Sequence, residues 1–241
     1  MKRFLKTELF SLFSIILGIV GMALQSWLFS TADSQGLLLH GHMAEILSYI
    51  LLAVFALVNF LFLKDTKPTG AYSHLFPQSL FAGIGSILAG LGIGLSAFSP
   101  EIVGVLRLVV KILGIASAAA LGYAGYCRLQ GKRPNCLLFA VVALFLIFRT
   151  LAFCQKWSAE VQVQTYFFPL LGGVSLLMAA YYRAAIGADM KGCRQYLFFR
   201  QLAIFCCLMS VAGGEALFYL AGAVWMATDA CNPEHFGKYI Q

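Results

Sequence analysis

The sequence predicts an all-α fold, a polytopic transmembrane bundle of seven helices that forms a single integral membrane domain over residues 1–241. Apolar residues make up 61% of the chain and charged residues only 11%, and the mean hydropathy is +0.84. Soluble domains carry about 25% charged residues. A chain this apolar cannot cover a soluble surface, so we expect the lipid bilayer to surround it. The third observation is a series of seven apolar runs, each near the length of about 20 residues that a membrane-spanning helix needs.

The first three helices follow from apolar runs at 9–29, 43–63 and 79–98. A signal peptide has an apolar region of about 7–15 residues that ends in small residues. The run 9–29 is longer and ends in large residues, so we expect it to be retained as a helix. The run 79–98 contains no charged residue and carries the pair Gly90xxxGly94. Small residues at this spacing let two helix backbones approach closely in a membrane.

The last four helices follow from the runs 102–126, 136–153, 166–186 and 202–227. The run 136–153 is the shortest, and its helix can extend to Trp157. Small residues recur at four-residue spacing in the run 102–126, on the same helix face. We therefore expect a set of small residues from the third and fourth helices to face other helices: Gly90, Gly94, Gly114, Ala118 and Gly122.

The distribution of Lys and Arg predicts the orientation of the chain, because cytoplasmic flanks collect basic residues. With seven helices, twelve of the 17 basic residues fall on one side: Lys2, Arg3, Lys6, Lys64, Lys67, Arg128, Lys132, Arg133, Arg183, Lys191, Arg194 and Arg200. Only Lys156 and Lys238 fall on the other side. We expect a multi-pass protein of a bacterial-type plasma membrane with a cytoplasmic N-terminus and an extracytoplasmic C-terminus. The net charge of +7 is then a topology signal, and we expect no nucleic-acid partner.

Four charged residues lie inside the apolar runs: Arg107, Lys111, Arg149 and Glu215. Each charge in the middle of a membrane costs roughly 3 kcal/mol on insertion scales. From the helical rise, Lys111 and Glu215 lie about 14 Å and about 18 Å below the outer ends of their helices, so we expect them to pair. Two glycines precede Glu215, and broken helices mark binding sites in transporters.

Two functions fit these four residues. In the first, they surround an outward-facing site whose excess positive charge binds a small anionic solute, such as a carboxylate or a phosphate. In the second, the protein is a structural or partner-binding membrane subunit without a ligand. Lys111 then pairs with Glu215, and Arg107 and Arg149 reach lipid headgroups or outer acids. A partner membrane protein or a second copy of the chain fits the second function.

We expect no enzyme, no cofactor and no metal site, because the four histidines all lie in loops or tails and no nucleophile–base pair is visible. His40, His42 and Glu45 are residue types that bind zinc or copper. No convincing further protein ligand accompanies them, so we interpret them as an exposed loop. The seven cysteines contain no CxxC motif, and Cys154 and Cys231 are expected on the same side of the membrane. Spacing alone does not decide whether those two are bonded.

Overall fold

A computed structural model describes residues 2–32, 38, 41–64, 76, 78–99, 106–157 and 164–230 of the chain. The secondary structure of this described part is helical and contains no strand. Its helices are α1 (Lys2–Ser30), α2 (Met43–Lys64), α4 (Leu80–Ser96), α5 (Leu106–Leu129), α6 (Cys136–Trp157), α7 (Gln164–Gly187), α8 (Cys193–Ser210), a 3-10 turn η1 (Val211–Gly213) and α9 (Ala216–Ala230). Six of them are long and apolar enough to cross a membrane, and α4 and α9 are shorter apolar helices. This agrees with the expected helical membrane bundle.

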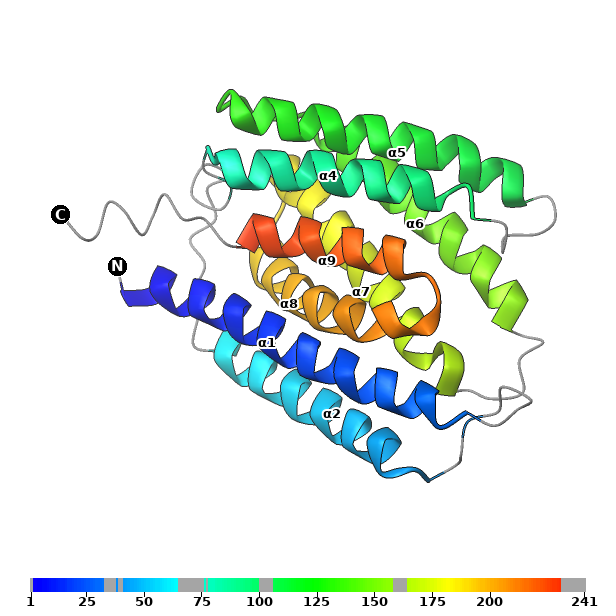
Figure 1. Ribbon diagram of the computed structural model, residues 1–241. Coiled ribbons are helices and arrows are strands. Elements are labelled where there is room, and N and C mark those ends of the chain that lie inside the picture. Colours follow the sequence, from blue (N-terminus) through cyan, green and yellow to red (C-terminus); the bar gives the residue numbers. More distant parts are fainter. Residues whose placement is uncertain are drawn as a thin grey trace.

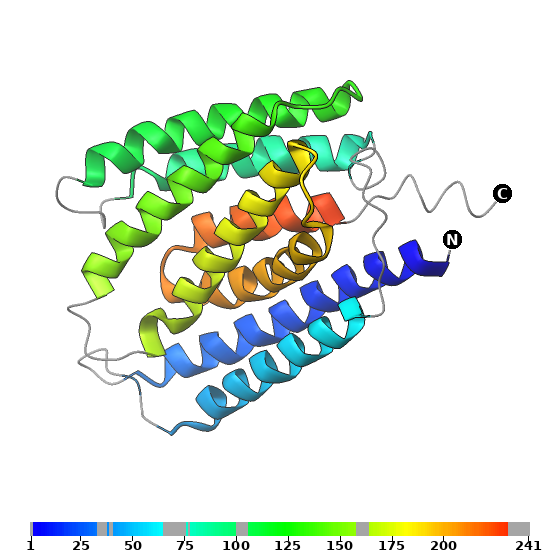
Figure 2. The ribbon, with the colours of Figure 1, turned by 180° about the vertical axis from the view of Figure 1, so that it is seen from behind.

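The helices lie side by side in one bundle (Figures 1 and 2). Helices α1 and α2 form one edge, α4 and α5 form the opposite edge, and α6 to α9 lie between them. Helix α9 packs against α4 and α8, and most of its side chains are buried. The short helix α9 is therefore the centre of the bundle, while the outer faces of α2, α4 and α5 expose large apolar side chains.

The expectation of a single helix over 202–227 is wrong. Helix α8 already begins at Cys193 and ends at Ser210, and α9 runs back beside it after a reversal (Figure 1). Gly214 makes the reversal with a φ of 105°, a conformation that residues with a side chain rarely adopt. Hydropathy does not detect the reversal because the residues around it, apart from Glu215, are apolar or small.

Helix α8 begins earlier than expected, and two polar residues that the sequence placed in the preceding loop, Arg200 and Gln201, are buried inside the bundle. The side-chain oxygen of Gln201 accepts a hydrogen bond of 2.9 Å from the Ser14 hydroxyl. Its amide nitrogen donates one of 2.7 Å to the Ser11 hydroxyl. These bonds join α8 to α1 and satisfy a side chain that would otherwise be expensive to bury. Polar residues that suggest a loop in the sequence are thus interhelical contacts.

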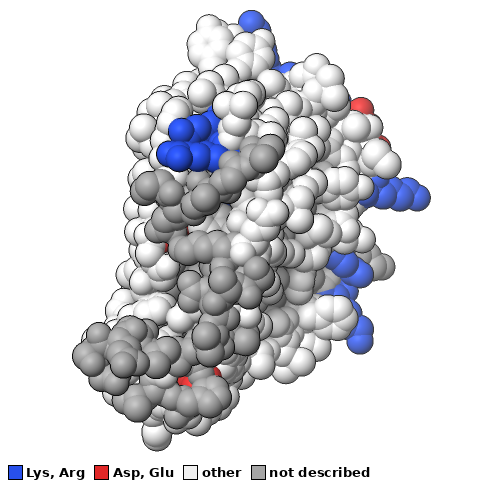
Figure 3. Space-filling view, turned by 90° about the vertical axis from the view of Figure 1, so that its right-hand side faces the viewer, with Lys and Arg blue, Asp and Glu red and all other residues white. Residues whose placement is uncertain are grey.

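The extra reversal places the start of α1 and the end of α9 at the same end of the bundle (Figures 1 and 2). The seven-helix expectation had placed the two termini on opposite sides. We call this end the basic end, because the described helix ends and turns there carry Lys64, Arg128, Lys132, Arg133, Arg183, Lys191, Arg194 and Arg200. The opposite end contains the α8–α9 reversal, and Figure 3 shows that side with charged side chains in a few separate places among uncharged residues.

Small residues bring α4 and α5 into close contact, as expected. A Cβ atom added at Gly90 would lie 3.0 Å from the carbonyl oxygen of Ala118, and one added at Gly94 would lie 2.8 Å from the Ala118 Cβ. Gly114 likewise faces a side chain just beyond the end of α4. Gly122 is the exception, because a Cβ added there would meet nothing within 4 Å. Its backbone does lie at the α4–α5 contact, since a Cβ added at Gly90 would be 3.4 Å from the Gly122 nitrogen, but its own side-chain position does not face another helix.

Of the residues considered for a metal or a disulfide, the structure describes His42, Glu45 and Cys154. The Nδ1 atom of His42 accepts a hydrogen bond of 3.2 Å from the backbone N–H of Ala44 at the start of α2. The Glu45 carboxylate accepts one of 3.0 Å from the backbone N–H of Gly41. The described residues contain no cluster of His, Cys, Asp and Glu suited to a metal ion. Cys154 is an exposed free thiol. His40 and Cys231 lie outside the described residues.

Candidate functional site

Two of the four predicted site residues, Arg149 and Glu215, contact each other in the half of the bundle that contains the α8–α9 reversal. Arg149 lies in the second half of α6, and Glu215 directly precedes α9. The Nη2 atom of Arg149 forms an ion pair with Oε2 of Glu215, and the exposed fractions of the two side chains are only 3% and 10%. The buried acid therefore lies at the helix break, as the sequence predicts, but its partner is a different cation from the one expected.

The expected pair between Lys111 and Glu215 is wrong. The ammonium of Lys111 lies over the ring of Phe98, 5.7 Å from its centre, and the side chain of Arg107 is exposed in the first turn of α5. Helix α4 lies between α5 and α9 (Figure 1), and α5 packs against α4 and α6. Depth along the helices suggested the pair, but the arrangement of helices around α9 decides which cation reaches Glu215.

Arg149 also contacts groups from its own helix, from α9 and from the end of α4. The centre of its guanidinium lies 3.8 Å from the ring centre of Phe218 and 5.0 Å from that of Phe153. Its Nη1 atom donates a hydrogen bond of 3.4 Å to the carbonyl oxygen of Ser96 at the end of α4. A cation over an aromatic face gains about 2 kcal/mol or more when it is desolvated. These contacts and Glu215 explain how a full charge is held inside an apolar bundle.

A small cavity adjoins this ion pair between α6, α7 and α9. Arg149 forms part of its wall, and the other lining residues are Thr150, Phe153, Pro169, Leu170, Gly173, Phe218 and Tyr219. Its volume is about 10 Å³, which is near the smallest space that holds one water molecule. The Tyr219 hydroxyl donates a hydrogen bond of 3.0 Å to the carbonyl oxygen of Pro169, and the Thr150 hydroxyl donates one of 2.8 Å to that of Leu146. The cavity therefore combines one cation and two hydroxyl groups with mostly apolar walls.

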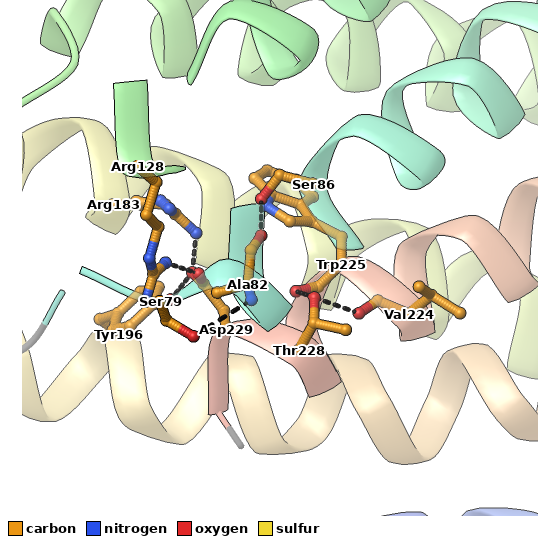
Figure 4. Close-up of polar contacts among 10 residues, drawn as sticks. All are labelled: Ser79, Ala82, Ser86, Arg128, Arg183, Tyr196, Val224, Trp225, Thr228 and Asp229. Atoms are coloured by element: carbon orange, nitrogen blue, oxygen red, sulfur yellow. Dashed lines mark hydrogen bonds and ion pairs between the residues drawn. The ribbon is translucent and has the colours of Figure 1, made fainter. Parts of the chain in front are cut away.

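A second buried ionic cluster lies at the basic end, and sequence reasoning missed it (Figure 4). Asp229, in the last turn of α9, has a fully buried side chain and forms ion pairs with Arg128 and Arg183. The hydroxyl of Tyr196 donates a hydrogen bond of 2.8 Å to Oδ2 of the same carboxylate. One carboxylate thereby joins the end of α9 to α5, α7 and α8.

Aromatic rings surround Arg183 in this cluster. Its guanidinium centre lies 4.4 Å from the ring centre of Phe139 and 4.8 Å from that of Phe76. In the sequence, Arg128 and Arg183 indicate only the topology of the chain, because both lie near expected helix ends. The one signal that pointed to the cluster was Asp229, an acid directly after the apolar run 202–227.

The two clusters together hold α9 at both ends. Each contains one acid at an end of α9 and arginine from neighbouring helices. Comparisons of the chain with models of protein families, with curated proteins and with solved structures found no match. The chemistry of these clusters is therefore the basis for any functional conclusion.

Proposed function

We propose that the protein is a multi-pass membrane protein that binds a small anionic solute for transport at a polar site around Arg149 and Glu215. The observation that carries the proposal is a buried arginine that binds a carboxylate beside a cavity and next to a helix break. Arginine suits planar anions because its donors match carboxylate and phosphate. Breaks inside membrane helices are where transporters bind their solutes. Arg107 and Lys111, which we had expected to join the site, are left out of it.

We further propose that the basic end faces the cytoplasm of a cell whose plasma membrane contains the protein. Basic residues collect on the cytoplasmic side of membrane proteins, and the described turns and helix ends with Lys and Arg gather at this end. Both the start of α1 and the end of α9 are then cytoplasmic. The site around Arg149 lies in the outer half of the bundle, so a solute reaches it from outside.

The proposal is tested by measuring the thermal unfolding of the purified protein in detergent with acetate, benzoate, phosphate or sulfate. A ligand that binds only the folded protein raises its unfolding temperature with concentration. We expect at least one of these anions to do so for the wild type. Arg149→Gln should lose the effect. The matched control is Arg107→Gln, which removes an exposed arginine outside the cavity and should retain it.

An alternative function is supported by the same ion pairs. Glu215 and Asp229 are each bound to arginine within the chain, as in a structural or partner-binding membrane subunit whose charges serve folding and assembly. In that case none of the four anions stabilises the wild type. Arg149→Gln then lowers the stability without changing any response to anions. A partner protein that co-purifies with the wild type and dissociates from the variant would favour this alternative.

A further inference from the structure

We infer that the solute is a monocarboxylate with an apolar body and that it binds together with one proton, which Glu215 takes up. This inference rests on the proposed function. In it, the carboxylate of the solute replaces the carboxylate of Glu215 on Arg149. Three features support it: the lining of the site, its charge and the position of Glu215 in the chain.

The first feature is that Glu215 already occupies the position of a bound carboxylate. Its Oε2 atom contacts the guanidinium of Arg149, whose donors in a fork match the two oxygens of a carboxylate. The walls beyond the guanidinium are mostly apolar or aromatic, including Phe153, Leu170 and Phe218. The cavity as observed holds about one water molecule, so a solute enters only as the Glu215 carboxylate leaves Arg149 and the walls move apart. A solute with one carboxylate and an apolar remainder then matches the chemistry of this lining, whereas a second charge or several hydroxyls would lack partners and lose their hydration.

The second feature is the balance of charge. The ion pair of Arg149 and Glu215 is neutral, and a monoanion that entered beside it would leave one uncompensated negative charge in a buried site. Desolvation of such a charge costs several kcal/mol. A proton on Glu215 removes this cost. The Arg149–Glu215 ion pair breaks, a proton taken up from the bulk solution binds an oxygen of Glu215, and an ion pair forms between Arg149 and the solute carboxylate. Solute and proton together add no net charge.

No other acid among the described side chains of the helices around the site is placed to take this proton. In the half of the bundle that contains Glu215, the described parts of α1 and α4 have no titratable side chain. Helix α2 carries Tyr49, whose ring packs on Phe167 and Phe168 of α7. Its one acid in this half, Glu45, lies one turn before Tyr49 at the exposed start of α2, where it accepts a hydrogen bond from the backbone N–H of Gly41. The described titratable side chains of the remaining helices in this half are cations, thiols and phenols: Arg107, Lys111, Arg149, Cys154, Tyr166, Tyr219, Cys206 and Cys207. Thiols and phenols are already protonated near neutral pH, so Glu215 is the group that gains the proton.

The third feature is the position of Glu215 in the chain. It lies between η1 and α9, outside both helices. Its carbonyl oxygen accepts hydrogen bonds of 3.1 Å and 3.3 Å from the backbone N–H groups of Phe218 and Tyr219. Two glycines precede it, and one of them, Gly214, has a positive φ. The backbone of Glu215 is therefore anchored to α9, while its side chain can leave Arg149 without disrupting a helix.

The test combines the binding of radiolabelled benzoate to the purified wild-type protein with a count of protons taken up in weakly buffered solution. A carboxylic acid of ordinary strength stays ionised between about pH 7.5 and about pH 5.5. We expect one proton per bound benzoate and an affinity that rises up to about tenfold for each pH unit of acidification. Glu215→Gln should bind benzoate without proton uptake, with little pH dependence and more tightly than the wild type near neutral pH. Asp189→Asn, which removes an exposed acid, should behave as the wild type.

The outcomes separate this inference from the proposed function. Benzoate binding without proton uptake would overturn the role of Glu215 and leave an anion site in place. Binding of phosphate or sulfate without binding of benzoate would overturn the solute class. Failure of all four anions to bind would overturn the proposed function itself. The proton count uses the wild type, so it decides the inference even if Glu215→Gln does not fold.

Discussion

Replacing Asp229 by asparagine should destabilise the bundle strongly, because one buried carboxylate balances two buried arginines. The side chain of Asp229 is 0% exposed, and those of Arg128 and Arg183 are 6% and 2% exposed. The substitution Asp229→Asn keeps the shape of the side chain but removes its charge. Two cations would then lie close together in a protein interior without the acid that they share.

The magnitude follows from what each change removes. Breaking a buried ion pair by neutralising one partner typically costs about 3–5 kcal/mol, or about two to four powers of ten in the folding equilibrium. Tyr196→Phe removes only the hydrogen bond of 2.8 Å to the carboxylate, and a bond to a charged group contributes about 1.5–3 kcal/mol. The matched control is Asp189→Asn. Asp189 pairs with Arg133 at the same end, but the two side chains are 73% and 43% exposed, and exposed pairs contribute about 0–1 kcal/mol.

The assay is reversible unfolding of the purified variants in mixed micelles, with the free energy of unfolding compared between them. We expect the loss of stability to be largest for Asp229→Asn, intermediate for Tyr196→Phe and smallest for Asp189→Asn. If Asp229→Asn and Asp189→Asn lose the same free energy, the carboxylate of Asp229 does not hold the helices together and the reasoning is refuted.

Three further predictions concern packing, the helix reversal and topology. Gly92→Ala should lower the free energy of unfolding by about 1–3 kcal/mol, because the added Cβ would lie 2.7 Å from a side chain of α9. The Cβ added by Gly122→Ala would have no neighbour within 4 Å, so this variant should be neutral or stabilising, and equal effects in the two variants would contradict this packing. Gly214→Ala should lose at least about 1 kcal/mol because of its φ of 105°, and a loss no larger than that of Gly122→Ala would argue against the reversal. A reporter joined after α9 should report the same side of the membrane as one inserted at Lys132, and the side opposite to that of a label on Cys154; reporters on different sides would restore the seven-helix topology.

Most of the helices could be predicted from the sequence, because crossing a lipid layer depends on a local property, the apolar character of about 20 consecutive residues. The helices α2, α4 and α7 lie close to the runs 43–63, 79–98 and 166–186. The close contact of α4 with α5 was also predictable, since small residues at four-residue spacing act through the backbone of their own helix. Glu215 beside a glycine pair could also be recognised, because an acid inside an apolar run is a local feature of the sequence.

The partners of the charged residues were decided only by the tertiary structure. Lys111 and Arg149 are both cations within apolar runs, and only the packing of α4 between α5 and α9 determines that Glu215 binds Arg149. Asp229 joins residues that are distant in the sequence, and nothing local marks them as neighbours. The reversal at Gly214 is a change of backbone direction within an apolar segment, to which hydropathy is insensitive. Hydropathy and composition sum over neighbours in sequence, whereas an ion pair depends on which helices are neighbours in space.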